Sequence, residues 1–385
     1  MPISSEALQN KLVAYRRELH EHPELSMQEF ETTKRIKKWL AEAGVKILNL
    51  PIKTGLVAEI AGARPGPVIM LRADIDALPV KELTDLPYQS QNEGVMHACG
   101  HDFHTAGMIG AAVLLNERKA QLNGTVRVLF QPAEENAAGA RWAVQHGLLD
   151  GVQAVFGCHN RPNLPVGTIG VRPGALMASV DRFLITVTGV GGHAGMPQNC
   201  VDPTVAASQI VVALQSIVSR RLNSFDNVVV SVTRFTSGNT WNVIPDKAEL
   251  EGTVRTFQQE ARAEVPRLMK QISEGIASAM GAQAALVWDE RVPVVNNSAR
   301  FTDVVTATAR EQGLTVVEGE RMFGGEDFAC FQEKVPGFFV WMGVDGPQEW
   351  HSPLFGLNED ALIVTASYFA KLAENVLKNW NAFAL

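Results

Sequence analysis

The 385-residue chain is poor in cysteine, lacks clusters of basic residues and contains no long apolar run. Four cysteines and no recognisable secretion signal at the N-terminus argue against a disulfide framework and predict a reducing, cytoplasmic location. The net charge of −7 comes without a Lys/Arg cluster, so we expect no nucleic-acid partner. No apolar run reaches the roughly 18 residues that a membrane span requires, so we expect no membrane partner.

The composition and the pattern of apolar runs predict a well-buried α/β protein. Hydrophobic residues make up 46% of the chain and charged residues 19%, and the length exceeds that of one ordinary core, so two domains are expected. Short apolar runs alternate with helical segments such as 105–118. This alternation predicts a mainly parallel sheet with helices on both faces. Its strands are expected at 68–71, 126–130, 154–156 and 338–342.

A second unit is predicted as an insertion in this alternation. Strand-like and helical segments follow one another in the order β-α-β-β-α-β, which is typical of a small ferredoxin-like α+β domain. Asp202 and Pro203 are suited to cap and open its first helix. We therefore expect a discontinuous first domain over 1–178 and 293–385, with the inserted domain over 179–292.

Polar residues follow the predicted strands of the first domain. Asp74 and Asp76 come after the first strand, Glu134 and Glu135 after the second, and His159 at the end of the third. The late strand leads to a loop that carries His351, and the octet H-A-C-G-H-D-F-H (97–104) precedes a helix. Ligands of open α/β sheets collect beyond the carboxyl ends of the strands, so we expect these side chains at one edge.

The residue types at this edge predict a metal site. Thiolate, imidazole and a carboxylate suit zinc, and also cobalt, nickel or manganese. Five protein donors exceed what one catalytic zinc uses, whereas two divalent ions that share a bridging thiolate would use them all. The adjacent carboxylates Glu134 and Glu135 point different ways, so one can bind metal while the other moves protons.

Blocks of sequence along almost the whole chain are similar to one enzyme group. Besides the octet they are R-R-E-L-H-E-H-P-E-L (16–25), R-A-D-I-D-A-L-P (72–79), Q-P-A-E-E (131–135), H-A-G-M-P (193–197), N-V-I-P (242–245), G-G-E-D-F (324–328) and W-H-S-P (350–353). In this order they resemble the metallo-amidohydrolases of the aminoacylase/carboxypeptidase superfamily. The branch is that of hippurate hydrolases, N-acyl-amino-acid amidohydrolases, N-acetyldiaminopimelate deacetylases and auxin-conjugate hydrolases.

The resemblance implies which of the donors at the sheet edge bind which metal ion. Cys99 would be the ligand shared by both ions. His101 and His159 would complete one ion, and Glu135 and His351 the other. Glu134 would act as general base and later as general acid. Asp76 would orient a metal ligand without binding the metal itself.

The resemblance also implies roles for the inserted domain, which would be a lid and a dimerisation domain. His193 would stabilise the oxyanion, in its own or in a neighbouring subunit's site. Asn242 and Arg255 would hold the carbonyl and the carboxylate of the substrate. A homodimer or a higher homo-oligomer is therefore expected.

The resulting hypothesis is metal-dependent hydrolysis of N-acyl amino acids of the hippurate type. N-acetyldiaminopimelate deacetylation and dipeptidase or carboxypeptidase activity remain open on the same scaffold. Two alternatives belong to other classes: a hydrolase with Cys99 as nucleophile, and a non-catalytic binding protein. The many additional donors argue against the first, and the complete donor set with Glu134 argues against the second.

Overall fold

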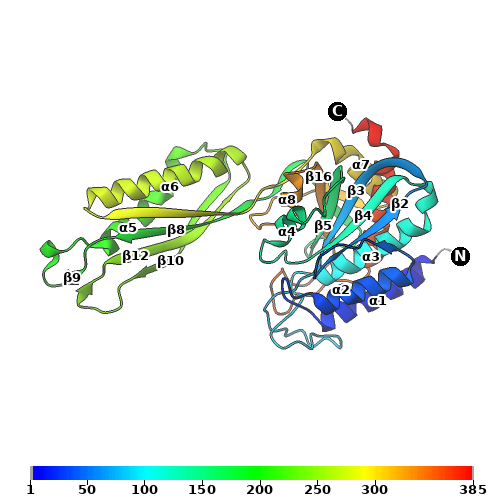
Figure 1. Ribbon diagram of the computed structural model, residues 1–385, viewed down its shortest axis with the longest axis horizontal. Helices are drawn as coiled ribbons and strands as arrows, with labels where there is room; N and C mark the ends of the chain where they lie inside the picture. Colours follow the sequence, from blue (N-terminus) through cyan, green and yellow to red (C-terminus); the bar gives the residue numbers. More distant parts are fainter. Residues whose placement is uncertain (1–2, 384–385) are drawn as a thin grey trace. The chain divides into compact units, whose positions relative to one another are not determined.

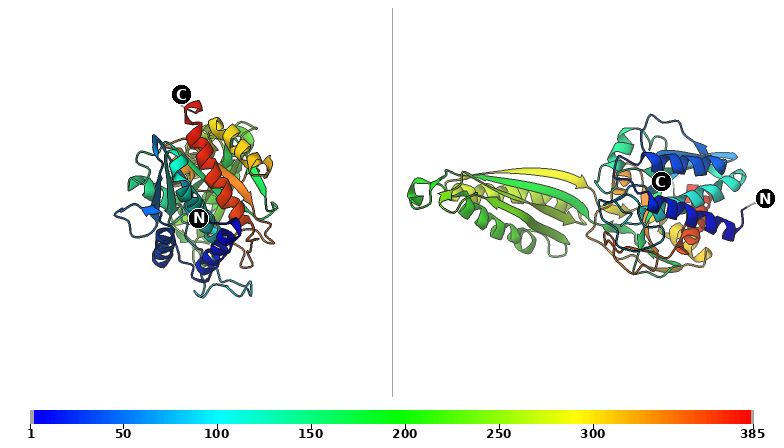
Figure 2. Two further views of the ribbon diagram at one scale, coloured as in Figure 1. Left: turned by 90° about the vertical axis from the view of Figure 1, so that its right-hand side faces the viewer. Right: turned by 90° about the horizontal axis from the view of Figure 1, so that it is seen from below.

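The computed structural model describes residues 3–383, which form two compact units (Figures 1 and 2). The first unit holds the chain up to Leu176, Asn296–Glu320 and the residues from Asp327 onward. The second unit holds Met177–Val295 and Arg321–Glu326. None of the described helices combines the length and the apolar character that crossing a lipid bilayer requires.

An eight-stranded sheet forms the centre of the first unit, in the order β1-β2-β4-β3-β5-β16-β6-β15. The four neighbouring strands β4, β3, β5 and β16 run parallel, while β1, β2 and the β16–β6 pair add antiparallel edges. Both faces of the central strands are buried, which is why the sequence shows them as continuous apolar runs. The strands are β1 (Lys46–Ile47), β2 (Leu56–Ala61), β3 (Arg64–Asp74), β4 (Asn123–Gln131), β5 (Ala154–Arg161), β6 (Thr168–Val171), β15 (Thr315–Glu318) and β16 (Gly337–Gly343).

Helices cover both faces of this sheet, as expected. One face packs in a single apolar cluster against α1 (Ser5–Glu21), α2 (Phe30–Glu42), α3 (His101–Glu117), α7 (Thr302–Glu311) and α9 (Ala361–Lys378), and α3 lies beside α9 (Figure 2). The other face meets the short helices α4 (Gly139–Gln145) and α8 (Ala329–Gln332), where the rings of Phe328 and Phe339 lie 4.7 Å apart. Short 3₁₀ turns complete the unit: η1 (Lys119–Gln121), η4 (Ala299–Phe301) and η5 (Trp380–Ala382).

The second unit has a four-stranded antiparallel sheet in the order β10-β12-β8-β13, with α5 and α6 packed in its apolar core. This β-α-β-β-α-β arrangement is the ferredoxin-like fold that the sequence predicted. Asp202 caps α5 by accepting the Thr204 N–H at 2.8 Å. The elements are β8 (Ser179–Thr188), α5 (Pro203–Ser216), β10 (Val228–Ser237), β12 (Lys247–Thr256), α6 (Gln259–Ala279) and β13 (Gln283–Val292).

Smaller elements complete the described chain. A two-stranded ladder pairs β9 (Gly192–His193) with β11 (Val243–Ile244), and a second ladder pairs β7 (Gly174–Met177) with β14 (Val295–Asn297). A 3₁₀ turn, η2 (Pro197–Asn199), follows β9, and a π-helical turn, η3 (Ile217–Arg221), follows α5.

Candidate metal centre

The five expected donors gather at the carboxyl edge of the parallel strands. In each of two groups the donor atoms lie within 4.8 Å of one another, and both groups include Cys99. One group is Cys99, His101 and His159, and the other is Cys99, Glu135 and His351. The donors come from the start of α3, the end of β5, the turn after β4 and the loop after β16. Cys99 therefore stands where one sulfur can serve two ions.

The first group is made of buried side chains whose free nitrogens face the sulfur. The Nε2 atom of His159 lies 3.3 Å from Cys99 Sγ, and its Nδ1 donates to the Asn160 carbonyl at 2.9 Å. His101 likewise donates from Nδ1 to the Asp76 carbonyl at 2.9 Å. Because each imidazole donates from Nδ1, its Nε2 lone pair is free to bind a cation.

Helix α3 begins four residues earlier than the sequence pattern indicated, so that His101 is its first residue. Gly100 precedes it with φ of 83°, in the left-handed region that glycine adopts readily. A Cβ at this position would also lie 2.5 Å from Asn160 Nδ2. Glycine therefore allows Cys99 and His101 to sit on both sides of a sharp turn.

The second group is more open. His351 Nε2 lies 3.6 Å from Glu135 Oε2, and the His351 side chain is 59% exposed. Its backbone has φ of 65°, and its N–H donates to the Ala98 carbonyl at 2.8 Å. That bond ties the late loop to the octet, so His351 is held beside Cys99 by the main chain.

Asp76 braces both groups at once. Its Oδ1 lies 3.2 Å from His101 Nδ1, and its Oδ2 accepts the Glu135 N–H at 3.0 Å and the Ser26 hydroxyl at 2.6 Å. A buried carboxylate with these donors orients one imidazole and the backbone of one carboxylate donor. The orienting role of Asp76 remains a prediction, and these contacts allow it.

Glu134 lies beside the donors but belongs to neither group that contains Cys99. It forms a separate cluster with His101 and Glu135, within the same 4.8 Å limit. The Asp327 N–H donates to Glu134 Oε1 at 3.3 Å. Glu134 therefore lies near Glu135, but only Glu135 shares a donor group with Cys99.

The electrostatics of the edge favour a cation. Burial raises the pKa of Cys99 well above its usual value, and Glu135 raises it further. Burial also raises the pKa of Glu135 to about 7, despite the opposing effect of His101. Burial and His104 keep the pKa of His159 well below its usual range, so this ligand stays neutral. A thiolate and a carboxylate side by side here need positive charge to offset their burial.

Two donor atoms without hydrogen-bond partners show whether the donor set suits a metal ion. His101 Nε2 and Glu135 Oε1 are buried without a hydrogen-bond partner, and they face each other at 3.7 Å. Buried polar atoms are ordinarily paired, so two orphaned donor atoms at this edge suit metal binding, with His101 on one ion and Glu135 on the other. Together with the sulfur common to both groups, this donor set fits a pair of divalent ions.

A buried polar network lies behind the strand edge. Arg72 donates to Asp74 and to Asp327, each at 2.7 Å, and Asp74 accepts from His104 Nδ1 at 2.6 Å. His104 Nε2 in turn accepts the Asn160 N–H at 2.9 Å. Asp74 and His104 stand next to predicted residues in the sequence, but only the fold reveals that they join the two strand ends.

Two of the predicted site residues of the second unit, His193 and Asn242, are exposed. His193 pairs with Val243 in the β9–β11 ladder, directly after Asn242. His193 Nδ1 accepts the Gly195 N–H at 2.9 Å, so the neutral ring carries its proton on Nε2. Asn242 is exposed, and its carbonyl accepts the Ala194 N–H at 3.1 Å. The ladder thus brings His193 and Asn242 together.

Arg255 lies on β12, apart from that ladder in the sheet topology. Its guanidinium donates to the Thr253 hydroxyl at 3.1 Å and to the Phe323 carbonyl at 3.4 Å, both neutral oxygens. The nearby carboxylate Asp181 is paired instead with Arg262 at 2.7 Å. Burial lowers the pKa of Arg255, with Asp181 opposing the shift. Among the described residues Arg255 has no carboxylate partner of its own.

Comparison with known proteins decides the family. The model of peptidase family M20/M25/M40 matches residues 70–375. The chain belongs to this family. It is 57% identical over 377 residues to the N-acetylcysteine deacetylase of Bacillus subtilis, covering 98% of this chain and 99% of the relative. It is 38% identical over 384 residues to an IAA-amino acid hydrolase of Arabidopsis thaliana, covering 95% and 86%.

A solved structure of an M20 peptidase from Bacillus subtilis, described as binding a dinuclear metal, is also similar. It shares 54% sequence identity and a TM-score of 0.90, over 97% of this chain and 99% of that chain. The expected fold class and enzyme class are confirmed: the chain is a metal-dependent M20 amidohydrolase. A pair of ions was expected, and the two donor groups that share Cys99 fit a dinuclear site of the kind that this solved structure is described as having.

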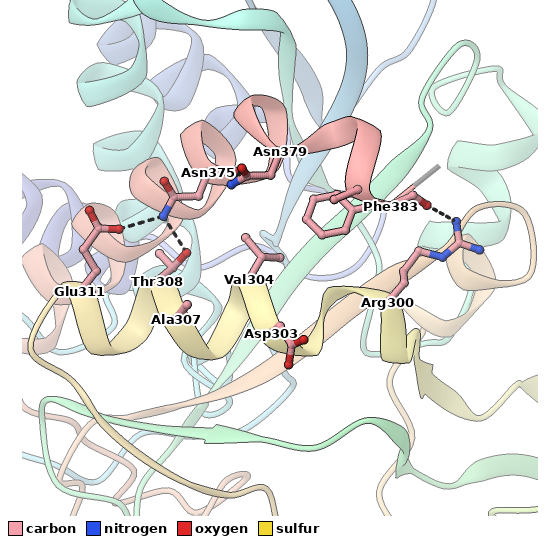
Figure 3. Close-up of a pocket in the computed structure, with 10 residues that line it drawn as sticks. Arg300, Asp303, Val304, Ala307, Thr308, Glu311, Asn375, Asn379 and Phe383 are labelled. Atoms are coloured by element: carbon pink, nitrogen blue, oxygen red, sulfur yellow. Dashed lines mark hydrogen bonds between the residues drawn. The ribbon is translucent and has the colours of Figure 1, made fainter. Parts of the chain in front are cut away.

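One sizeable cavity of this M20 enzyme lies away from the donors. It has a volume of about 550 Å³, and Figure 3 shows its lining from α7 and the end of α9. Asn375 donates there to Thr308 and Glu311, at 3.0 and 2.9 Å, and none of the metal-donor residues takes part. No metal-donor residue lines this cavity, so we assign the chemistry to the strand edge.

Proposed function

We propose that this M20 enzyme hydrolyses the amide bond of N-acyl amino acids, releasing a carboxylic acid and a free amino acid. The observation that carries the proposal is the division of donors at the strand edge. Cys99 is common to two donor groups, while Glu134 stands beside them outside both. A carboxylate left over at a metal edge is suited to move protons.

The names of the relatives support this substrate class. One is a deacetylase of N-acetylcysteine and another a hydrolase of IAA-amino acids, so the element common to both names is an amino acid with an acylated nitrogen. The acyl groups differ. We therefore propose the N-acyl amino acid as the substrate class, with acetyl as the first acyl group to test and benzoyl, as in hippurate, beside it.

In the proposed reaction the water oxygen attacks the amide carbon while Glu134 accepts a proton from that water. Glu134 then delivers this proton to the amide nitrogen, and the C–N bond breaks to give acid and amine. The metal pair held by Cys99 and its two donor groups would polarise the carbonyl and acidify the water. The Asp327 N–H bond to Glu134 Oε1 supports a fixed direction for the carboxylate.

The second unit would supply the remaining contacts. His193 carries its proton on Nε2, so this nitrogen can donate to the oxyanion that forms on the carbonyl oxygen. Arg255, which lacks a carboxylate partner among the described residues, suits the carboxylate of the amino acid. Asn242 would donate to the carbonyl from beside His193.

We also propose that the second unit is the lid and dimerisation domain. β10 is an edge strand of its sheet, and Val205 and Val212 on α5 are 52% and 68% exposed. An open strand edge and apolar residues on the neighbouring helix favour pairing with a second copy. Mixing E134Q and H193A proteins tests whether His193 serves the other subunit. A trans arrangement restores about a quarter of wild-type activity by random pairing of subunits, and a cis arrangement restores none.

The test of the substrate class is a panel of N-acyl amino acids assayed for released amine. The protein is stripped of metal, reconstituted with zinc, manganese, cobalt or nickel in turn, and compared with the stripped protein. N-acetylcysteine, hippurate, N-acetyldiaminopimelate and dipeptides make up the panel. Turnover of N-acyl amino acids that depends on metal supports the proposal. Turnover that survives complete chelation would favour Cys99 as nucleophile, although burial and Glu135 keep the pKa of that thiol high.

A further inference from the structure

The turn that presents Glu134 contains an unusual backbone conformation. Ala133 has φ of 59°, in the left-handed region, and it directly precedes the two glutamates. An L-residue with a Cβ is disfavoured there and stays only when its surroundings hold it. Ala133 is also fully buried, so the turn cannot rely on water to satisfy its N–H.

Glu29 supplies the bond that holds this turn. The Ala133 N–H donates to Glu29 Oε1 at 2.9 Å across 104 residues of sequence. The same oxygen accepts the Met27 N–H at 2.9 Å, which anchors it to the start of α2. On the other side of the turn the Gly139 N–H donates to the Ala133 carbonyl at 2.9 Å. Both polar groups of Ala133 are thus bound, and only one of these partners is a side chain.

The Glu29 carboxyl binds two backbone N–H groups, those of Met27 and Ala133. It is fully buried, its Oε2 has no hydrogen-bond partner, and no lysine or arginine among the described residues pairs with it. Burial raises the pKa of Glu29 to about 7. The free N–H groups at the start of α2 are served by Glu24, which accepts from Glu31 at 3.2 Å and from Thr32 at 2.7 Å.

We propose that Glu29 is a positioning residue for the Glu134–Glu135 pair. By accepting the Ala133 N–H, it keeps Ala133 left-handed and so sets the direction in which both glutamates leave the turn. Glu135 has a second hold, because Asp76 accepts its N–H at 3.0 Å. Glu134 is held by a longer bond, from the Asp327 N–H to its Oε1 at 3.3 Å, so we expect loss of Glu29 to displace Glu134 more than Glu135. The catalytic consequence rests on the proposed role of Glu134 as proton carrier.

The test compares E29A with E29Q and with the matched control E24A in the full-length, metal-reconstituted protein. Glu24 also accepts backbone N–H groups around α2 but does not bind the turn at Ala133. We expect E29A to lower kcat by about 10- to 100-fold, with KM changed less than about threefold, because the base is misplaced while the binding groups remain. E29Q keeps an oxygen that can accept the N–H, so it retains most of the activity. E24A lowers the unfolding temperature without a comparable loss of kcat.

A second substitution separates positioning from general stability. Glycine adopts the left-handed region without the penalty of a Cβ, so A133G makes the turn depend less on Glu29. We expect the double variant E29A/A133G to recover several-fold of the kcat lost in E29A, while its unfolding temperature rises no higher than that of E29A. Metal content, measured per chain, should stay close to that of the wild type in all variants.

The outcomes are separable from the fate of the proposed function. Wild-type kcat in E29A beside an inactive E134Q protein would overturn the role of Glu29 alone. Equal losses of kcat in E29A and E24A, or no recovery on adding A133G, would also overturn it by showing that only stability is affected. A fully active E134Q protein would overturn the proposed function instead.

Discussion

In the first unit the metal donors are buried or held by the main chain, whereas in the second unit exposed His193 lies in a two-residue ladder and exposed Asn242 directly precedes it. His101 and His159 each donate from Nδ1 to a carbonyl, and Asp76 holds the backbone of Glu135. The His193 side chain accepts one hydrogen bond, from the Gly195 N–H. Under the proposed function the two units would contribute differently to catalysis. The first would provide a preorganised metal site, and the second would provide contacts that form when substrate is bound.

The largest effect is expected from the residue common to both donor groups. Cys99→Ala removes the shared sulfur, so activity should fall by at least about 10³-fold, and bound metal should be lost. Elemental analysis per chain and a turnover assay measure both losses. Cys330→Ala is the matched control, because this thiol is buried in α8 and burial raises its pKa to about 12. Equal metal content in the two variants would contradict a bridging role for Cys99.

The second-largest effect is expected from the buried ion pair of Asp102, the residue after the metal donor His101. Asp102 lies 2.7 Å from Arg16 and 2.8 Å from His20, all buried. Asp102→Ala leaves Arg16 without this partner and should lower the free energy of unfolding by about 3–5 kcal/mol. Glu251→Ala, which breaks exposed pairs with Arg182 and Arg234 in the second unit, should change it much less. Chemical unfolding at neutral pH measures both variants, and similar losses would contradict the contrast between the units.

The Asp102–Arg16 pair also predicts how the free energy of unfolding changes with pH. Burial alone would raise the pKa of Asp102, but Arg16 and His20 together hold this pKa below its usual value. The stabilisation is therefore fully present above about pH 4, the pKa of an unfolded aspartate, and is lost as the pH falls toward the folded-state value. The difference in unfolding free energy between wild type and Asp102→Ala should shrink below pH 4. A difference that grows on acidification would contradict this assignment.

His193→Ala should lower kcat by about 10²- to 10³-fold, because it removes one donor to the oxyanion. Metal content and unfolding temperature should not change, since the His193 side chain is exposed and its hydrogen bond among the described residues is with Gly195, two residues along the chain. His146→Ala, an exposed histidine that donates to the Trp142 carbonyl, is the control. Loss of metal in His193→Ala would mean that the second unit contributes to the metal edge after all.

The smallest effect on activity is expected at Arg255. Arg255→Ala should reduce kcat/KM by about 10- to 100-fold, mainly through KM, because a charge-assisted bond to the substrate carboxylate is lost. Arg182→Ala serves as control, as its guanidinium is already paired with Glu251. An amide substrate without a carboxylate should show no difference between wild type and Arg255→Ala. A similar loss with that substrate would contradict the assigned contact.

The donors at the sheet edge could be predicted because each one is marked by its neighbours in the sequence. Each donor follows an apolar strand or opens a helix, and parallel strands bring such ends to one edge. Glu29 offered no such signal: it is one of many acidic residues near a helix start, and only the fold shows its bond to Ala133. Arg72 and Asp327 likewise meet across 255 residues. His193 and Arg255 lie in ordinary loop and strand patterns, so only resemblance singled them out. The start of α3 was misplaced because left-handed Gly100 permits an earlier beginning.

The most direct test of the central claim is the turnover of Glu134→Gln reconstituted with metal. The substitution keeps the shape of the side chain and removes its ability to carry a proton between water and amine. We predict a fall in kcat of about 10²- to 10⁴-fold on the best N-acyl amino acid, with metal content unchanged. A Glu134→Gln protein that retains full turnover would contradict the account.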